Sequence, residues 1–276
     1  MDAPSHSSSP ATPRSAEYTI PIAAPPDAVW KAITDPRELE RWFPLRANVT
    51  PGVDGWMQFI WGPGHDLKNH LPISIWKPRE HLQYGMPQPS GGARVIHDFT
   101  IEDHGTSTIL RLVAHGFDPD ARWDDFFDGV RRGWRYELQS LRHYLEHHRG
   151  EDRAVAWVRT PIPAGAERAW ATLFATGGWR PDAPIEDKRR DERYSIEAPD
   201  CTVLTGTVVI AEHPKDFTGT AEGPEMNNAI LRTEIVAQPD GLVLSIWLEA
   251  WGVPATKLAA ITTAWQPALD NLFSAD

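Results

Sequence analysis

Hydrophobic and polar positions alternate with the two-residue period of a β-strand along most of the first half of the chain. The alternation begins at residues 18–22. It recurs in five later runs bounded by Pro or Gly, at residues 56–61, 71–76, 81–86, 94–102 and 106–115. Strands of this length that are separated by short turns pair with their neighbours. The pattern therefore predicts a meander of antiparallel strands.

Three segments of the first half predict helices instead. Pro26 suits the first turn of a short helix that carries Trp30. Pro36 keeps Asp35 out of the helical region, and Asp35 can cap a second short helix that ends near residues 42–44. From residue 123 to about residue 148 the period becomes helical. One face of this long helix carries an apolar stripe of Trp123, Phe127, Val130, Trp134, Leu138 and Leu141.

The second half repeats this plan. Pro161 and Trp170 each lie 140 positions after a matching residue, Pro21 and Trp30. Near the C-terminus the spacing of Trp134, Leu138 and Leu141 recurs as Trp265, Leu269 and Leu272. Strand-like runs between them occupy residues 192–197, 202–211, 229–237 and 242–251. Matches at both ends of a segment indicate an internal duplication.

The repeat predicts two domains after a short tail. Residues 1–16 are rich in Ser, Pro and Ala without a large apolar side chain, which predicts a disordered tail. The first domain is expected at residues 17–149 and the second at residues 152–276. Residues 177–181 read as a loop, so the second domain is expected to lack the second short helix. Ten of the eleven histidines lie in residues 1–150, which favours the first domain as the place of any site.

The first half resembles the START-like superfamily, also called SRPBCC or birch-pollen-allergen-like, and within it the homologues of the heat-shock-protein-90 ATPase activator. The resemblance rests on residues 22–30, 34–43 and 133–146, read as IAAPPDAVW, TDPRELERWF and GWRYELQSLRHYLE. It implies an α+β fold of helix-grip domains, each a curved antiparallel sheet wrapped on a long C-terminal helix. The second half resembles a divergent copy. The superfamily includes binders, transporters, cyclases and co-chaperones, so the resemblance implies a fold before an activity.

Charge and cysteine content narrow the classes of function. The net charge of −11 disfavours binding to nucleic acid, which needs a concentrated basic face. Cys201 is the one cysteine, so neither an intramolecular disulfide nor a multi-thiolate metal site can form. No run of apolar residues is long enough to span a membrane, and no signal peptide opens the chain. These features predict a cytoplasmic protein, with no indication of its oligomeric state.

The candidate binding residues are those that the strand and helix periods place on interior faces. In the run at residues 94–102, His97 and Phe99 share a face with apolar neighbours. His97 fits a hydrogen-bonded core histidine, a polar group that orients a ligand, or a general base. Aromatic side chains expected to surround a cavity between sheet and long helix are Trp42, Phe59, Trp61, Trp123, Phe127 and Trp134. Plain core packing is the alternative for all of them.

Other groupings of chemically active residues have ordinary explanations. His143 and His147 have metal-ligand spacing, but imidazoles also suit the C-terminus of a helix. Asp124, Asp125 and Asp128 complement the dipole at the start of the same helix. The chain carries no phosphate-binding loop, dinucleotide fingerprint, nucleophile elbow or zincin motif. We therefore expect no metal, no cofactor and no dedicated catalytic residues.

Three hypotheses of function follow. The leading one is a protein that binds an apolar or amphipathic small molecule between the sheet and the long helix of the first domain. An enzyme of the cyclase, dehydratase or hydrolase type would need His97 together with Asp98 or Glu102. The alternation of the strand places both carboxylates on the face opposite to His97. An interaction module similar to a co-chaperone would contact its partner through its surface.

Overall fold

The computed structural model describes residues 13–62, 70–91, 94–163, 165–175 and 177–274. The chain divides into two compact units. One comprises Met1–Leu39 with Pro44–Arg131, and the other comprises Glu40–Phe43 with Arg132–Asp276. Each unit contains one seven-stranded sheet.

The sheet of the first unit is antiparallel throughout, in the order β1-β7-β6-β5-β4-β3-β2. Neighbouring strands in the sequence pair in space, except that β1 closes on β7. This is the meander that the alternation predicts. The strands are β1 (Arg14–Ile22), β2 (Arg46–Thr50), β3 (Trp56–Ile60), β4 (Leu71–Lys77), β5 (His81–Met86), β6 (Val95–Asp103) and β7 (Thr108–Phe117).

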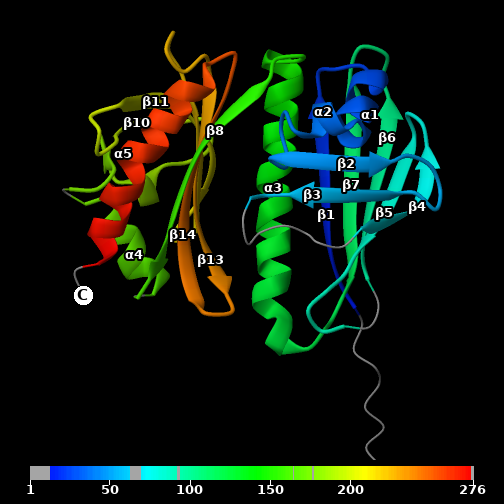
Figure 1. The fold of residues 1–276 in the computed structure, drawn as a ribbon, viewed down its shortest axis with the longest axis horizontal. Coiled ribbons are helices and arrows are strands. Elements are labelled where there is room, and N and C mark those ends of the chain that lie inside the picture. Colours follow the sequence, from blue (N-terminus) through cyan, green and yellow to red (C-terminus); the bar gives the residue numbers. More distant parts are fainter. Residues whose placement is uncertain (1–12, 63–69, 92–93, 164, 176, 275–276) are drawn as a thin grey trace, which may run out of the picture. The chain divides into compact units, whose positions relative to one another are not determined.

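Two short helices, α1 (Pro26–Thr34) and α2 (Pro36–Leu39), connect β1 to β2 and lie side by side (Figure 1). Pro26 opens α1, and the helix buries Val29, Trp30 and Ile33. Asp35 is extended, as a residue before proline should be. Its Oδ1 accepts hydrogen bonds from the backbone N–H groups of Arg37 (2.9 Å) and Glu38 (3.2 Å), which confirms the predicted cap.

A long helix, α3 (Asp124–His147), follows β7 and the 3-10 turn η1 (Ala121–Trp123). In the first unit its opening turns pack on the sheet, where Phe126, Phe127 and Val130 contact the buried side chains of Val95, Ala114 and Phe117.

The second sheet has the order β8-β14-β13-β12-β11-β10-β9, which is the order of the first sheet with every strand replaced by its counterpart seven places later. The strands are β8 (Arg153–Ile162), β9 (Arg180–Pro181), β10 (Arg193–Glu197), β11 (Val203–Glu212), β12 (Asp216–Ala221), β13 (Ala229–Gln238) and β14 (Gly241–Trp251). The internal duplication read from the sequence therefore extends to strand topology.

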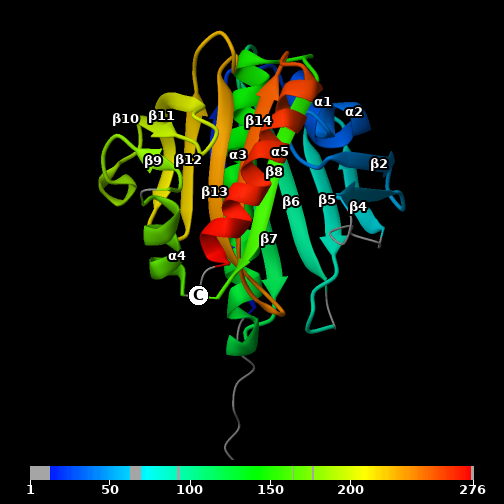
Figure 2. The same cartoon turned by 60° about the vertical axis from the view of Figure 1, so that its left-hand side comes forward.

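Helices α4 (Ala166–Leu173) and α5 (Ala255–Phe273) follow β8 and β14, as α1 and α3 follow β1 and β7. The 3-10 turn η2 (Ile185–Asp187) lies between β9 and β10, whereas α2 of the first unit precedes β2. Figure 2 shows α5 crossing the face of the second sheet, where it contacts β8. Trp265 and Leu269 of α5 are fully buried, as the matched spacing predicts. Both sheets carry a packed helix, so the predicted α+β helix-grip fold is confirmed.

Several boundaries differ from the predictions. Strand β1 begins at Arg14, inside the segment predicted as a tail at residues 1–16, because Arg14 pairs with Phe117; residues 1–12 lie outside the described part. Helix α2 is one turn long and ends at Leu39, before the predicted end near residues 42–44. Strands β2, β8, β9 and β12 were not among the predicted runs; β2 and β9 are short strands at a sheet edge, and β8 forms the other edge of the second sheet.

Candidate functional site

Four aromatic rings form a ladder across the buried face of the first sheet. The register pairs Tyr84 on β5 with His97 on β6, and their rings stack with centroids 5.1 Å apart. Tyr84 also stacks with Phe99 at 6.0 Å and meets Phe59 edge-on at 5.9 Å. All four residues are at most 3% exposed. We call Phe59, Tyr84, His97 and Phe99 the aromatic ladder.

The polar members of the ladder are held neutral by burial. Removal of His97 from water lowers the pKa of its imidazole to about 3, and the nearby His115 contributes in the same direction. Burial also raises the pKa of the Tyr84 phenol well above its usual range. Near neutral pH the ladder therefore offers one neutral imidazole and one neutral hydroxyl among apolar rings.

The acidic residues near His97 in the sequence do not lie beside its side chain in the structure. Asp98 lies on the opposite face of β6, where its Oδ1 is 2.8 Å from Nε2 of His81. Glu102 is exposed and its carboxylate contacts the ring of His104 at 3.0 Å. The alternation of the strand keeps both carboxylates away from the buried face. The pairing of His97 with Asp98 or Glu102 that an acid and base mechanism would need is absent from the described residues.

The other predicted aromatic residues fall into separate places. Trp42 stacks on Phe43 at 5.1 Å, and Phe43 stacks on Trp134 at the same distance; all three are buried in the second unit. Phe127 meets Phe117 edge-on at 5.0 Å in the first unit. Trp61 and Trp123 are partly exposed. Of the eight predicted ligand-binding residues, the structure gathers Phe59, His97 and Phe99.

Tyr84 was missed by sequence reasoning although its signal was present. In the predicted strand at residues 81–86, Tyr84 alternates in phase with Leu82, which is buried. The pairing partner of His97 depends on the register between the two strands, which the sequence does not state.

A buried network of charged side chains occupies the second unit and was also missed. The carboxylate of Glu249 on β14 accepts hydrogen bonds from the Tyr136 hydroxyl, the Ser140 hydroxyl and Nη1 of Arg153, each at 2.7 Å. Glu249 is 1% exposed. The residues of α3 in this network, Tyr136 and Ser140, lie four positions apart on one face of the helix, which was a readable signal.

The network continues along β13. The guanidinium of Arg232 lies 3.9 Å above the ring of Tyr136, 2.6 Å from the carboxylate of Glu234 and 3.5 Å from that of Glu137. Burial raises the pKa of Glu137 well above its usual range. Because these groups satisfy one another, the network fixes residues of α3 on β13 and β14 and is structural.

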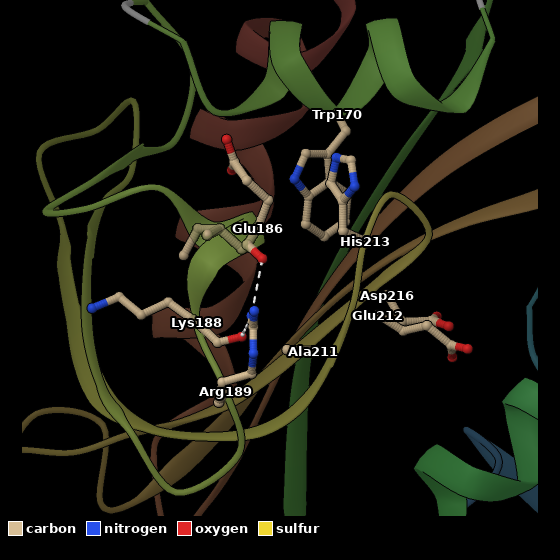
Figure 3. Close-up of a pocket in the computed structure, with 9 residues that line it drawn as sticks. Trp170, Glu186, Lys188, Arg189, Ala211, Glu212, His213 and Asp216 are labelled. Atoms are coloured by element: carbon tan, nitrogen blue, oxygen red, sulfur yellow. Dashed lines mark hydrogen bonds between the residues drawn. The ribbon is translucent and has the colours of Figure 1, made fainter.

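A depression of about 200 Å³ lies in the second unit and is lined by residues of α4, η2, β11 and β12 and the loops that follow η2 and β11 (Figure 3). Its wall includes the Trp170 ring, which meets His213 edge-on at 5.5 Å. Sequence reasoning placed any site in the first domain and assigned none of these residues to a site, although Trp170 served as a marker of the internal repeat. They are Trp170, Ile185, Glu186, Lys188, Arg189, Ala211, Glu212, His213 and Asp216.

The histidines at the end of α3 serve the packing of the second unit. Nε2 of His143 lies 2.7 Å from the backbone oxygen of Asn228, and His148 stacks on Trp251 at 4.8 Å. Burial lowers the pKa of His143 to about 4. Among the described residues, no group of three or more His, Cys, Asp or Glu side chains is arranged to hold a metal ion. None of the described helices is long and apolar enough to cross a membrane.

Comparison with known proteins gives a family and several similar folds. Residues 23–146 match the family described as Activator of Hsp90 ATPase homolog 1-like protein. A search of curated proteins finds no match. The similar solved structures include protein MLL2253 from Mesorhizobium loti, at 23% identity over 49% of this chain and 98% of that chain, with a TM-score of 0.42.

Two further structures are similar in the same range. The Aha1 dimer from Colwellia psychrerythraea matches at 20% identity over 50% of this chain and 99% of that chain, with a TM-score of 0.42. The di-domain ARO/CYC BexL from the BE-7585A biosynthetic pathway matches at 16% identity over 95% of this chain and 99% of that chain, with a TM-score of 0.42. Residues 23–146 thus match the Activator of Hsp90 ATPase homolog 1-like family, and the repeated strand order shows that the chain carries the helix-grip fold twice.

Proposed function

We propose that the first domain binds an apolar or amphipathic small molecule against the aromatic ladder, with a neutral polar group of the ligand directed at His97 and Tyr84. The observation that carries the proposal is the placement of these two polar rings inside an apolar face, each 3% exposed or less. A ligand hydroxyl or carbonyl can form a hydrogen bond with either ring.

Chemistry of the ladder favours a neutral ligand group over an ion. His97, with its pKa lowered to about 3, stays uncharged near neutral pH, and Tyr84 stays protonated. An uncharged imidazole both donates and accepts one hydrogen bond, and so does a phenol. The rings of Phe59 and Phe99 offer stacking surface on either side. This combination suits a ligand with a planar apolar body and one or two oxygen atoms.

The same pKa supports binding over acid and base catalysis. A general base works best when its pKa lies near the operating pH, and an imidazole with a pKa of about 3 is too weakly basic near neutrality. The carboxylates of Asp98 and Glu102 lie away from it. The enzyme hypothesis would therefore need a ligand that changes the environment of His97.

Native mass spectrometry of the full chain, after purification and after incubation with planar oxygen-bearing apolar compounds, tests the proposal. We expect a ligand-bound species in the wild type and about tenfold weaker binding in His97→Gln. The reason is that the loss of one hydrogen bond between the ligand and a buried group costs about 1–2 kcal/mol. His115→Gln is the matched control, since His115 is exposed on the neighbouring strand.

Two outcomes would reject the proposal. One is the absence of any bound compound across the set. The other is equal affinity in the wild type, His97→Gln and Tyr84→Phe. Binding of a purified Hsp90-type chaperone by a chain that takes up no small molecule would instead support the interaction-module hypothesis.

A further inference from the structure

The second unit contains a depression with the properties of a binding site, separate from the ladder. Its volume is about 200 Å³. An apolar cavity of about 150 Å³ is known to hold one benzene molecule, so this space has room for a single substituted ring and not for a fused ring system. Ile185 and Ala211 supply apolar surface beside the ring of Trp170.

Trp170 brings an unused hydrogen-bond donor to this space. The residue is 2% exposed, and within the described residues its buried Nε1 has no hydrogen-bond acceptor. A buried indole N–H normally finds a partner, because an unsatisfied donor costs about 1–3 kcal/mol. In Figure 3 the nitrogen-bearing edge of Trp170 faces the side of the depression on which Glu186 lies.

Opposite charges mark two ends of the depression. The guanidinium of Arg189 is held in place because its Nη1 donates to the backbone oxygens of Glu186 (3.2 Å), Asp187 (2.9 Å) and Lys188 (3.1 Å). Figure 3 shows the Glu186 carboxylate on the far side of the depression from that guanidinium.

The remaining charged residues of the lining point elsewhere. The carboxylates of Glu212 and Asp216 point away from Trp170 in Figure 3 and form ion pairs with Arg135, while Asp216 also pairs with Arg132 at 2.9 Å. The amino group of Lys188 donates to the backbone oxygen of Arg193 at 2.8 Å. Arg189 and Glu186 are therefore the charges that a ligand meets.

We infer that this depression binds a single-ring aromatic acid that carries a hydroxyl group. The ring lies against Trp170, Ile185 and Ala211. The carboxylate of the ligand pairs with Arg189, for which a guanidinium is the preferred partner. Its hydroxyl accepts from Nε1 of Trp170 and donates to Glu186. This site lies in the second unit and does not depend on the ligand proposed for the first domain.

Titration of the full chain with 4-hydroxybenzoate, followed in the ¹⁵N–¹H spectrum of the tryptophan indoles, tests this inference. The Trp170 signal is identified as the one missing in Trp170→Phe. We expect it to move downfield as its N–H gains an acceptor, with a dissociation constant of about 1 mM, which is usual for a ligand of this size. The indoles of Trp179 and Trp265 are internal controls, because each is buried without an acceptor among the described residues and neither lines the depression.

Matched ligands and variants separate the two ends of the site. We expect 4-hydroxybenzamide, which lacks the charge, to bind about tenfold more weakly, and Arg189→Gln to weaken 4-hydroxybenzoate by a similar factor. Benzoate, which lacks the hydroxyl, should bind to the wild type more weakly than 4-hydroxybenzoate does. Because benzoate makes no contact through a hydroxyl, its affinity should be the same in the wild type and in Glu186→Gln. The inference is overturned if the Trp170 signal stays fixed up to about 10 mM ligand, if Trp179 and Trp265 move as much as Trp170, or if Arg189→Gln leaves the affinity unchanged.

Discussion

The two sheets share one strand order but bury different chemistry at the same place in that order. In the first sheet the fourth residue of β5 pairs with the third residue of β6, and these are Tyr84 and His97. In the second sheet the fourth residue of β12 pairs with the third residue of β13, and these are Gly219 and Leu231. The first pair is polar and aromatic, whereas the second is apolar and small.

The space left by Gly219 is filled by the protein itself. A Cβ atom at this position would lie 2.3 Å from the ring of Tyr194, which comes from β10 and whose hydroxyl donates to the backbone oxygen of Thr220 at 2.7 Å. The surrounding cluster includes Leu231, Phe217 and Leu248, all at most 1% exposed. The comparison teaches that the fold can close this position without a tyrosine–histidine pair, so Tyr84 and His97 are not a requirement of the fold.

The largest expected difference between the two interiors is a response to acid. The folded-state pKa of His97 is about 3, below the ordinary value of 6.5, so the unfolded chain binds the proton more readily. The contribution of neutral His97 to the free energy of unfolding is fully present above pH 6.5. It is lost as the pH falls towards 3, and the total loss is up to about 4–5 kcal/mol. Urea unfolding between pH 7 and pH 4 should show a shallower loss in His97→Leu than in the wild type. Parallel pH profiles for the two proteins would contradict this expectation.

Placing a histidine in the second interior should reverse the comparison. Leu231→His removes a fully buried aliphatic side chain and buries a polar ring among apolar neighbours. We expect the free energy of unfolding of the second unit to fall by about 3–5 kcal/mol. Chemical denaturation measures the change, and Leu231→Met, which keeps the volume, should lose less than about 1.5 kcal/mol. Equal stability of the histidine and methionine variants would contradict the burial of Leu231 among apolar side chains.

Crowding at Gly219 tests the filling of the second interior more gently. Gly219→Ala adds one methyl group against the Tyr194 ring, which must move. Overpacking of this kind costs about 1–3 kcal/mol, and the double variant Gly219→Ala with Tyr194→Leu should recover part of the loss. Differential scanning calorimetry of the single and double variants provides the comparison. Strictly additive effects would show that the two residues do not share the space.

The smallest expected effect is a gain in stability at the ladder. His97→Leu replaces a buried polar ring by an apolar side chain of similar size, and we expect about 1 kcal/mol of added stability at pH 7 together with weaker ligand binding. Thermal unfolding without ligand measures the first change. A marked loss of stability would mean that His97 serves the fold rather than a ligand.

The sequence predicts the elements better than their contacts. Strand and helix periods located β3 to β7, β13, β14 and α3 closely, because their apolar residues recur at a clear period. Strands β2 and β9 carry few residues, and five of the six residues of β12 are buried, so no alternating period marks these three strands. The predicted second helix ends after one turn at Leu39, and the residues that follow it, Glu40–Phe43, belong to the other unit.

The candidate site shows the same limit. Parity placed His97 and Phe99 on one buried face, but the ring contact with Tyr84 depends on the register between β5 and β6. Trp42 and Trp134 were grouped with the ladder because both are aromatic and interior, yet they stack on Phe43 in the second unit. The depression beside Trp170 is lined by residues of four elements between residues 170 and 216, and no periodic pattern shows which of their side chains meet.

The central claim is that the ladder of the first domain contacts a ligand through His97, and the ring nitrogens of the histidines report on this most directly. A long-range ¹⁵N–¹H spectrum of the full chain at pH 7, assigned with His97→Gln, should show His97 as a neutral imidazole. On saturation with an apolar ligand found by mass spectrometry, the account predicts that the His97 nitrogens shift while those of His143, which is in the second unit and does not line the depression, stay in place. A saturated ligand that leaves the His97 nitrogens unmoved would contradict it.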